Sequence, residues 1–362
     1  MGLRILHLVP SIPFGGMQRL VASLAAEQIR QGLDVLVGSI YEDSRFGELL
    51  ASKNVPFETL GGNRPSLRAA FTLSRLLNRY SPKIVHLHAA LLWTNLVGWV
   101  CKKEPWIYHA HTYPKVSPTT KSRLVDCVTS RLCDVQIAVS ESVSKQMLHH
   151  QRNRSRAFVV HNGIDWHAGS QPIRRAFCEE SPVFGTAMRM VMDKGLHAFV
   201  KVAREISTRQ PSARFVVAGD GPDIADFESE LASQGLSEVV KILGHVTDMN
   251  NFWSKIDVFL FVSPRDTFGL TIVEAMACGV PVAAYRTGAG SDEILRDGET
   301  GLMAEYGDAK GLAHQAIQFV LERPLRERVS QHGFDNAKKK YTIRVCAQGI
   351  NEVYSNVLSH RT

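Results

Sequence analysis

The sequence predicts an α/β protein with two doubly wound domains, each built on a parallel sheet. Short apolar segments of strand length alternate with helix-length segments along the whole chain. This alternation implies parallel strands joined by right-handed crossovers. The chain has 362 residues, enough for two domains of ordinary size. A single parallel sheet would be unusually wide, so two sheets of about six or seven strands are expected.

The expected strands divide evenly between the two halves of the chain. In the first half they are predicted at 4–9, 34–41, 57–60, 84–88, 106–111, 135–140 and 158–161. In the second half they are predicted at 183–188, 214–218, 240–243, 258–262, 282–285 and 301–303. Helical patterns lie between them, such as 19–31 and 194–209, the second ending before Pro211.

The domain boundary is expected between 165 and 182. Asn162-Gly163-Ile164-Asp165 is a turn signal, and the following stretch is polar and has no clear periodicity. We therefore predict a first domain over 1–165, a linker over 166–182 and a second domain over 183–335. The carboxy-terminal part, including 336–362, has helical patterns and no further strand. Two such domains are expected to face a cleft, with ligands beyond the carboxyl ends of the strands.

Composition excludes several classes of protein. The chain is 44% apolar and 21% charged, close to ordinary globular values. This excludes a disordered chain, a fibrous rod and a small disulfide scaffold. Apolar runs are too short for a spanning helix, and we identify no signal peptide. The six cysteines form no C-x-x-C pair and are expected to be free thiols in a reducing cytoplasm.

The positive charge is concentrated in the first half of the chain. The net charge is +7, but residues 1–166 carry +9 and residues 167–362 carry −2. An anionic partner of the first half is therefore expected. Residues 64–80 form a basic amphipathic helical pattern, and 149–156 is a second basic stretch. The apolar side of the first pattern is expected to comprise Leu67, Ala70, Phe71, Leu73, Leu77 and Tyr80. Either stretch could lie on an anionic membrane, or each could be a solvated surface face. No nucleic-acid-binding signature is present.

Three segments after predicted strands contain residues suited to an anionic ligand. Gly15-Gly16 directly precedes a helix, whose free N–H groups favour anions, although an ordinary glycine turn is the alternative. Arg189 and Lys194 follow the strand at 183–188 and could clamp a diphosphate, or could be solvated surface charges.

The third segment follows the strand at 258–262. Asp266 lies in its loop, and Gly269-Leu270 opens a helix whose N–H groups could face phosphate. Glu274 stands on this otherwise apolar helix, where a buried carboxylate needs partners. Sugar or ribose hydroxyls would be suitable partners, and an internal salt bridge is the alternative.

Together these motifs resemble the retaining glycosyltransferases of family 4, which have the GT-B fold of two Rossmann-like domains. The resemblance covers nearly the whole chain in order and spacing. It also includes Gly219-Asp220-Gly221-Pro222, the stretch 275–281 and Asp297-Gly298-Glu299-Thr300-Gly301. Two positions depart from the family pattern: Asp266 replaces the usual glutamate, and Met188 replaces the glycine before the clamp arginine.

The resemblance implies a role for each candidate residue. Arg189 and Lys194 would neutralise the donor diphosphate, assisted by the helix starts at Gly16 and Gly269. The donor would be a UDP- or GDP-linked sugar. Its other contacts are implied at Gly15, Asp266, Phe268, Leu270 and Glu274, with Asp266 on the sugar and Glu274 on the ribose. The resemblance also implies that residues 336–362 pack back on the first domain.

A histidine beside the reacting sugar is also implied by the resemblance. His109 and His111 are both candidates, and His111 is favoured because it ends the strand. The pairs His86-x-His88 and His109-x-His111 could suit zinc. No carboxylate or cysteine motif joins them, so no metal site and no cofactor are expected.

The implied reaction transfers a sugar to an acceptor hydroxyl with retention. The acceptor would be a carbohydrate or a lipid-linked molecule in bacterial polysaccharide, lipopolysaccharide or glycolipid assembly, at the inner face of the cell membrane. Alternatives are a small-molecule acceptor, a hydrolysing nucleotide-sugar epimerase, or a noncatalytic nucleotide-sugar binder.

Overall fold

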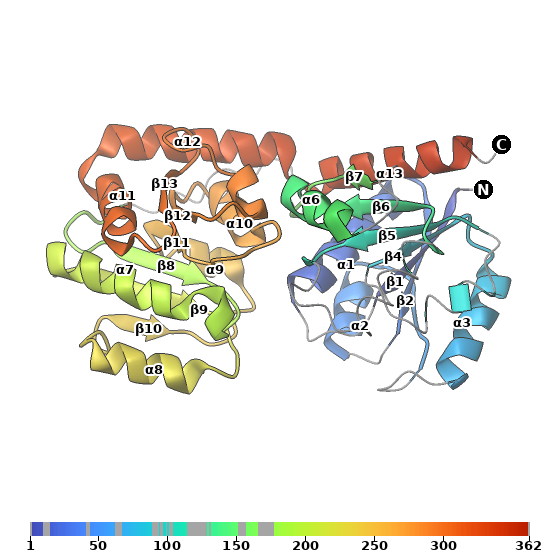
Figure 1. The fold of residues 1–362 in the computed structure, drawn as a ribbon, viewed down its shortest axis with the longest axis horizontal. Helices are drawn as coiled ribbons and strands as arrows, with labels where there is room; N and C mark the ends of the chain where they lie inside the picture. Colours follow the sequence, from blue (N-terminus) through green and yellow to red (C-terminus); the bar gives the residue numbers. More distant parts are fainter. Residues whose placement is uncertain are drawn as a thin grey trace. The chain divides into compact units, whose positions relative to one another are not determined.

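A computed structural model gives the structure of the chain and divides it into two compact units. It describes residues 2–9, 15–40, 44–61, 67–88, 94, 97–98, 100, 104–113, 129, 132–150, 157–165 and 177–360. The first unit comprises Met1–Asp165 and Thr342–Thr362, and the second comprises Trp166–Tyr341. Each unit contains one parallel sheet covered by helices (Figure 1), so the predicted fold class is confirmed.

The first unit has a seven-stranded sheet in the order β3-β2-β1-β4-β5-β6-β7, with every pair parallel. The order reverses beside β1, which is the doubly wound arrangement. The strands are β1 Arg4–Val9, β2 Asp34–Ser39, β3 Phe57–Thr59, β4 Ile84–Leu87, β5 Trp106–Ala110, β6 Val135–Ala138 and β7 Ala157–Val159.

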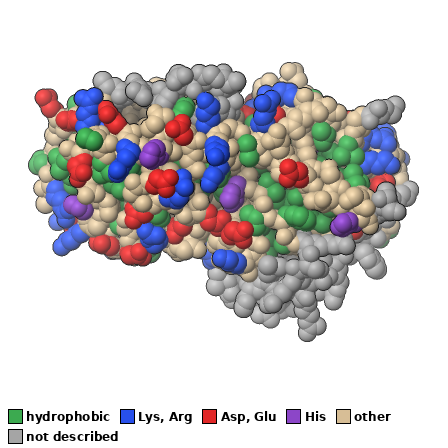
Figure 2. All heavy atoms as spheres, turned by 90° about the horizontal axis from the view of Figure 1, so that it is seen from above, with side chains coloured by type: hydrophobic (Ala, Val, Ile, Leu, Met, Phe, Trp, Pro, Cys, Tyr) green, Lys and Arg blue, Asp and Glu red, His purple; other side chains and the backbone are tan. Residues whose placement is uncertain are grey.

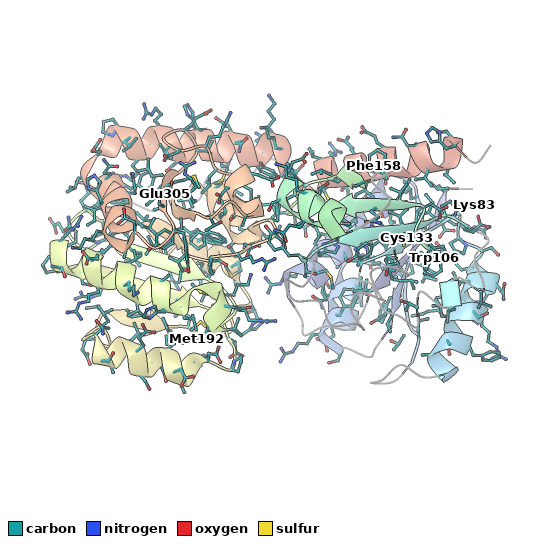
Figure 3. The ribbon with its side chains drawn as sticks, in the orientation of Figure 1. Lys83, Trp106, Cys133, Phe158, Met192 and Glu305 are labelled. Atoms are coloured by element: carbon teal, nitrogen blue, oxygen red, sulfur yellow. The ribbon has the colours of Figure 1, made fainter. Side chains whose placement is uncertain are left out.

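Helices cover both faces of this sheet. Helices α1 (Gly16–Arg30), α2 (Ser44–Ser52) and α13 (Ile343–Ser359) contribute to one apolar cluster. Helix α3 (Leu67–Tyr80) packs on a second cluster, which includes Trp106 and Cys133 (Figure 3). Helix α6 (Glu141–His150) contacts β6 and β7.

The second unit has a six-stranded parallel sheet in the order β10-β9-β8-β11-β12-β13. Its strands are β8 Val183–Ala187, β9 Arg214–Ala218, β10 Val240–Ile242, β11 Val258–Phe261, β12 Val282–Arg286 and β13 Leu302–Glu305. Its helices are α7 Leu196–Arg209, α8 Ile224–Ser233, α9 Met249–Trp253, α10 Leu270–Ala277, α11 Ala309–Leu321 and α12 Arg323–Lys340, with short 3₁₀ turns η1 Met192–Lys194 and η2 Gly290–Glu293. Acidic and basic side chains are interspersed over the visible face of this unit (Figure 2), in keeping with its small net charge.

The return of the chain to the first unit comes at Thr342, later than the predicted 336. Helix α12 continues to Lys340 and packs on α10, so it belongs to the second unit. Only α13 joins the first unit, where it packs on α1. Thr342 pairs with Ile164, and the Ile343 N–H donates to the Ile164 carbonyl at 2.7 Å.

The end of the predicted linker packs on the second unit. Of residues 166–182, only 177–182 are described, and these pack on the second unit. Phe177 lies against the core of that unit, with the Arg326 guanidinium 3.6 Å from its ring centre. Arg326 also pairs with Glu179 at 3.2 Å. A single aromatic anchor and one ion pair have no periodicity, so the sequence pattern did not reveal them.

Among the described residues, no helix combines the length and the apolar character that crossing a bilayer requires.

Candidate active site

A tight turn at the end of β8 brings Lys194 to the loop after β11. Gly195 follows η1 with φ of 92°, a conformation that favours glycine. A Cβ at this position would lie 2.4 Å from the Val262 carbonyl oxygen, so only glycine permits this approach. Lys194 Nζ consequently lies 2.9 Å from Asp266 Oδ2. Two candidates that lie 72 positions apart in sequence are thus joined at the carboxyl edge of the sheet.

Asp266 also fixes the start of α10. Its Oδ1 accepts the backbone N–H of Phe268 at 3.3 Å and that of Gly269 at 3.0 Å. Gly269 is the N-cap residue of α10, with φ of 92°. The Gly269 N–H, expected to face phosphate, is therefore already donated to Asp266. The short aspartate side chain is the reason, since it reaches the backbone directly after it.

Glu274 and Leu270 are half-buried on α10, and Phe268 is buried. Burial raises the pKa of the Cys278 thiol to about 12, and the nearby charge of Glu274 adds to this effect. Phe268 packs edge-on against Tyr341, which fixes the loop before α10. Glu274 thus lies on the helix that begins directly after this loop.

Arg189 is exposed just beyond β8. The Asp266 carboxylate pairs with Lys194, and no ion pair of Arg189 is seen among the described residues. Met188, which replaces the family's glycine, has no positive φ: the described non-glycine residues with positive φ are Asn54 and Ser81. The replacement therefore leaves an ordinary backbone here, and Met188 packs on the core.

A cavity of about 450 Å³ lies beside this loop, which the sequence patterns did not reveal. Its wall is formed by Pro264, Arg286, Thr287, Gly288, Asp292, Glu305 and Tyr306. Glu305 ends β13 and is labelled in Figure 3. The Gly290 N–H donates to the Asp266 carbonyl at 3.1 Å, so the two loops are neighbours. The signal that could have revealed this cavity is the glycine-containing stretch 287–290 after β12.

In the first unit, Gly15 is the N-cap of α1, and the helix begins at Gly16. The Gly15 N–H donates to Gln18 Oε1 at 3.1 Å, so this donor already has a partner within the protein. The rest of the predicted loop, 10–14, lies outside the described residues.

His111 follows β5 directly and belongs to a row of five imidazoles. His7 on β1, His86 on β4 and His109 on β5 are completely buried. His88 follows β4, with 2% of its surface exposed. The rings lie on neighbouring strands, and their centres are 4.2–5.7 Å from the neighbouring aromatic ring. His7 was missed because its neighbour across the sheet, His86, is 79 positions away, a pairing that only the strand order creates.

These rings are neutral near pH 7. Burial lowers the pKa of His7 to about 4, against a smaller opposing effect of its hydrogen bond to Gln28. Burial lowers the pKa of His111 to about 3. Burial, followed by the neighbouring imidazoles, also lowers the pKa of His86, His88 and His109 well below the ordinary value.

The imidazole nitrogens lie close enough to one another for a metal site to be considered. Two trios, His7/His86/His88 and His88/His109/His111, have ring nitrogens within 4.8 Å. In the first trio, however, every ring nitrogen is already in a hydrogen bond with another side chain. A cation would have to displace these bonds, so the first trio suits a hydrogen-bond network better than a metal.

Two family models match the two halves of the chain. The model described as "Glycosyltransferase Family 4" matches residues 14–167, and the one described as "Glycosyl transferases group 1" matches residues 181–322.

Relatives of known name match over part of their length. The N-acetyl-alpha-D-glucosaminyl L-malate synthase of Bacillus anthracis is 28% identical over 45% of this chain and 41% of its own length. The lipopolysaccharide core biosynthesis glycosyltransferase LpsE of Rhizobium meliloti is 29% identical over 50% of this chain and 51% of its own. These matches therefore span about half the length of the relatives.

The fold of the whole chain matches solved structures. The crystal structure of Anabaena HepE, in complex with UDP and glucose, has a TM-score of 0.84. The match covers 98% of this chain and 100% of HepE, at 20% identity. At this identity the likeness concerns the fold alone.

The buried imidazoles predict acid sensitivity of the first unit. In the unfolded chain each histidine takes up a proton near pH 6.5, while the folded state resists protonation until about pH 4 for His7. Stability is therefore complete above pH 6.5 and falls between pH 6.5 and 4, by up to about 1.4 kcal/mol per pH unit for each ring. Thermal unfolding followed from pH 7.5 to 4.5 measures this. His7→Gln should give a shallower dependence, and unfolding independent of pH in this range would contradict the prediction.

Proposed function

We propose that the chain is a retaining glycosyltransferase of the GT-B fold, because glycosyltransferase models match residues 14–167 and 181–322. It transfers a sugar from a nucleotide-sugar donor to an acceptor hydroxyl, without a metal ion. The second unit binds the donor, and the first unit binds the acceptor.

The observation that carries this proposal is the convergence of Lys194 and Asp266 beside α10. A lysine ammonium, the start of a helix and a nearby exposed arginine together suit a diphosphate. They lie at the carboxyl edge of a parallel sheet, where ligands of such sheets bind. Asp266 holds Lys194 in place before the donor arrives, and the half-buried Glu274 is assigned to the ribose hydroxyls.

The chemistry follows from where charge develops. The bond between the anomeric carbon and the diphosphate breaks, and negative charge gathers on the leaving phosphate. Lys194 and Arg189 stabilise that charge more in the transition state than in the bound donor. The acceptor oxygen bonds to the anomeric carbon on the same face, and its proton goes to the departing phosphate. His111 of the first unit is assigned to the hydroxyls of the reacting sugar.

For the substrates, we propose a UDP- or GDP-linked donor and a carbohydrate or lipid-linked acceptor. The name of LpsE refers to lipopolysaccharide core biosynthesis, whereas that of the Bacillus relative refers to L-malate. A small-molecule acceptor is therefore the second candidate. We place the reaction in the cytoplasm, at the inner face of the membrane if the acceptor is lipid-linked.

A donor screen followed by a transfer assay tests the proposal. Thermal unfolding is measured with UDP-, GDP- and ADP-sugars, since a ligand at 100 times its dissociation constant adds about 2.7 kcal/mol of stability. Release of nucleotide from the stabilising donor is then measured with and without acceptor, and with EDTA. Release that needs acceptor and resists EDTA supports the proposal. Epimer formation, or binding without turnover for every acceptor class, overturns it.

The donor residues give the first functional prediction. Lys194→Ala and Glu274→Ala should each reduce transfer at least tenfold at subsaturating donor, because each removes a contact to the charged donor. Lys201→Ala is the matched control, since Lys201 is an exposed lysine of α7. Turnover near the wild-type value in both site variants would refute the assignment.

Asp266 gives a prediction about donor choice. Asp266→Glu lengthens the side chain by one methylene, which displaces the carboxylate from Lys194 and from the Gly269 N–H. We expect kcat/KM to change unequally among donor sugars, by more than the affinity for free nucleotide changes. Kinetics with several sugars on the same nucleotide measure this, and equal losses for every sugar would argue against a sugar contact.

The structure corrects the predicted apolar face of the basic helix α3. Ala69, Leu73 and Leu76 are buried against the sheet, so this helix has an ordinary packing face. Phe71, assigned to that face, is instead 58% exposed, and the Arg75 guanidinium lies 4.2 Å from its ring centre. Arg64 and residues 151–156 of the second basic stretch lie outside the described residues.

We nevertheless propose weak membrane association through this exposed pair. An aromatic ring beside a basic group suits the interface of an anionic bilayer. Sedimentation with anionic vesicles should show binding that weakens at about 0.5 M salt, since added salt shortens the screening length. Phe71→Ser together with Arg75→Gln should reduce it, while Lys201→Ala should not. Binding that is absent at low salt, or indifferent to lipid charge, would contradict the prediction.

A further inference from the structure

An unbroken line of hydrogen-bonded side chains connects Glu27 of α1 with His111 in the first unit. It starts at Glu27 and ends at the ring that follows β5. Its hydrogen bonds are Glu27 Oε1 to Gln31 Nε2 at 2.9 Å, Gln31 Oε1 to Asn351 Nδ2 at 2.8 Å, Asn351 Oδ1 to Gln28 Nε2 at 3.0 Å, Gln28 Oε1 to His7 Nε2 at 2.8 Å, His7 Nδ1 to His88 Nε2 at 2.8 Å and His88 Nδ1 to His111 Nε2 at 2.9 Å.

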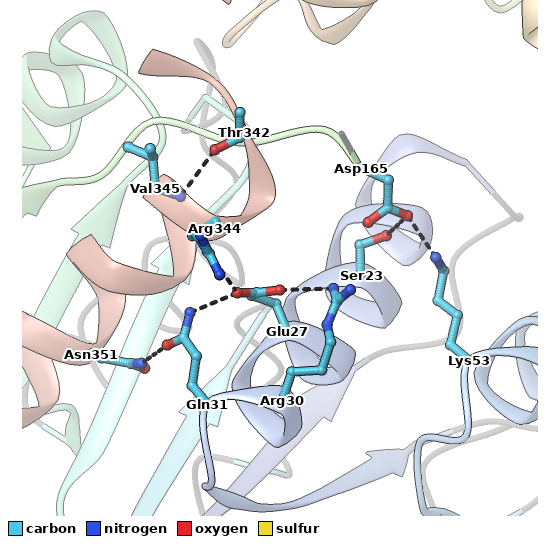
Figure 4. Close-up of polar contacts among 10 residues, drawn as sticks. All are labelled: Ser23, Glu27, Arg30, Gln31, Lys53, Asp165, Thr342, Arg344, Val345 and Asn351. Atoms are coloured by element: carbon cyan, nitrogen blue, oxygen red, sulfur yellow. Dashed lines mark hydrogen bonds and ion pairs between the residues drawn. The ribbon is translucent and has the colours of Figure 1, made fainter. Parts of the chain in front are cut away.

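The hydrogen bonds from Glu27 to Gln28 can run in only one donor-to-acceptor direction. The Glu27 carboxylate, paired with Arg30 at 2.8 Å, only accepts hydrogen bonds. Gln31 must therefore turn its NH₂ group toward Glu27 and its oxygen toward Asn351 (Figure 4). The same reasoning orients the amides of Asn351 and Gln28. The Gln28 oxygen is thereby presented to His7, and any reversed amide would set two donors or two acceptors against each other.

This polarity continues through the imidazoles. A neutral imidazole has one N–H donor and one acceptor nitrogen. His7 donates from Nε2 to the Gln28 oxygen, so its Nδ1 accepts. His88 must then carry its proton on Nε2, and His111 must do the same. Burial keeps these rings neutral, because it lowers the pKa of His7, His88 and His111 below the ordinary value.

A second branch leaves the same Gln28 amide. Gln28 Nε2 lies 3.5 Å from the Tyr354 hydroxyl, whose oxygen is 2.5 Å from His86 Nδ1. Burial raises the pKa of Tyr354, so the hydroxyl keeps its proton. In the arrangement that matches the first branch, this hydroxyl donates to His86 Nδ1. His86 Nε2 then donates to His109 Nδ1 at 3.2 Å. His109 Nε2 therefore carries the proton, and this buried atom has no hydrogen-bond partner among the described residues.

We propose that Glu27 and Gln28 are positioning residues that hold His111 as the neutral Nε2–H tautomer. Its Nδ1 is then an acceptor, and whatever group meets Nδ1 must donate a hydrogen bond to it. A sugar hydroxyl can do so, whereas a phosphate or carboxylate oxygen cannot. The assignment of a sugar as that group rests on the proposed function, but the tautomer itself does not.

The ring nitrogens report the tautomer directly. The protein without donor, labelled with ¹⁵N-histidine, is examined by long-range ¹H–¹⁵N correlation at pH 7.5, and His111→Gln identifies the His111 signals. We expect a protonated Nε2 and an unprotonated Nδ1 for His111, with the same pattern for His7 and His88. A protonated Nδ1 at His111 overturns the proposal.

Two substitutions of Gln28 separate positioning from packing. Gln28→Met removes the acceptor of the His7 N–H, and His111 should then lose its single tautomer. Gln28→Glu keeps an acceptor at this position and should retain the wild-type His111 signals. Asn336→Leu is the control for loss of a buried amide, since Asn336 is 8% exposed in the second unit. Unchanged His111 signals in Gln28→Met would refute the role of Gln28.

The tautomer measurement does not depend on catalytic activity. It needs no donor and no acceptor, so a failed transfer assay leaves the tautomer result intact. Conversely, a wrong tautomer leaves the Lys194 and Glu274 results intact. If Gln28→Met fails to fold, the wild-type spectrum alone decides whether His111 carries its proton on Nε2.

Discussion

The hydrogen bonds of the buried Gln28 side chain are the interactions on which the packing of the first unit depends. This side chain lies where α1 and α13 meet the sheet, and it contacts His7, Asn351 and Tyr354. An unpaired polar group at such a place would cost about 1–3 kcal/mol. The packing of α13 on α1 is therefore specific as well as apolar. A helix from the far end of the chain supplies two of the partners that make this burial possible.

A sheet interior that holds five imidazoles would be costly if the rings were charged or unpaired. The structure avoids both costs, because each ring is neutral and hydrogen-bonded to another side chain. Such networks are specific because one wrong orientation disrupts the whole line. The free energy of unfolding decreases at low pH, because the unfolded chain binds protons that the buried imidazoles of the folded unit do not bind. The single unpaired buried atom among these rings, His109 Nε2, lies beside His111.

In the second unit, one glycine and one carboxylate position the candidate site. Glycine at 195 allows the start of α7 to approach β11, and Asp266 then joins the ammonium of Lys194 to the start of α10. The carboxylate neutralises the lysine and caps the helix at once. Under the proposed function, a diphosphate would meet a lysine and a helix start whose positions this carboxylate already fixes. The adjacent cavity, walled by Arg286 and Thr287–Gly288, enlarges the region beyond the residues found by motif.

The sequence by itself determined the fold class, all thirteen strands and the order of the motifs. Strand periodicity is local, and most predicted ends lie within one or two residues of the observed ones, as for 4–9 and 214–218. Family motifs also pointed to Lys194 and Asp266, whose side chains the structure brings within 2.9 Å of each other. Only the tertiary structure decided that 177–182 pack on the second unit and that Phe71 faces solvent. It also placed His7 beside His88, and Asn351 beside Gln28. The physical reason is that these contacts join residues far apart in the chain, through strand order and helix docking, which leave no periodic trace in the sequence.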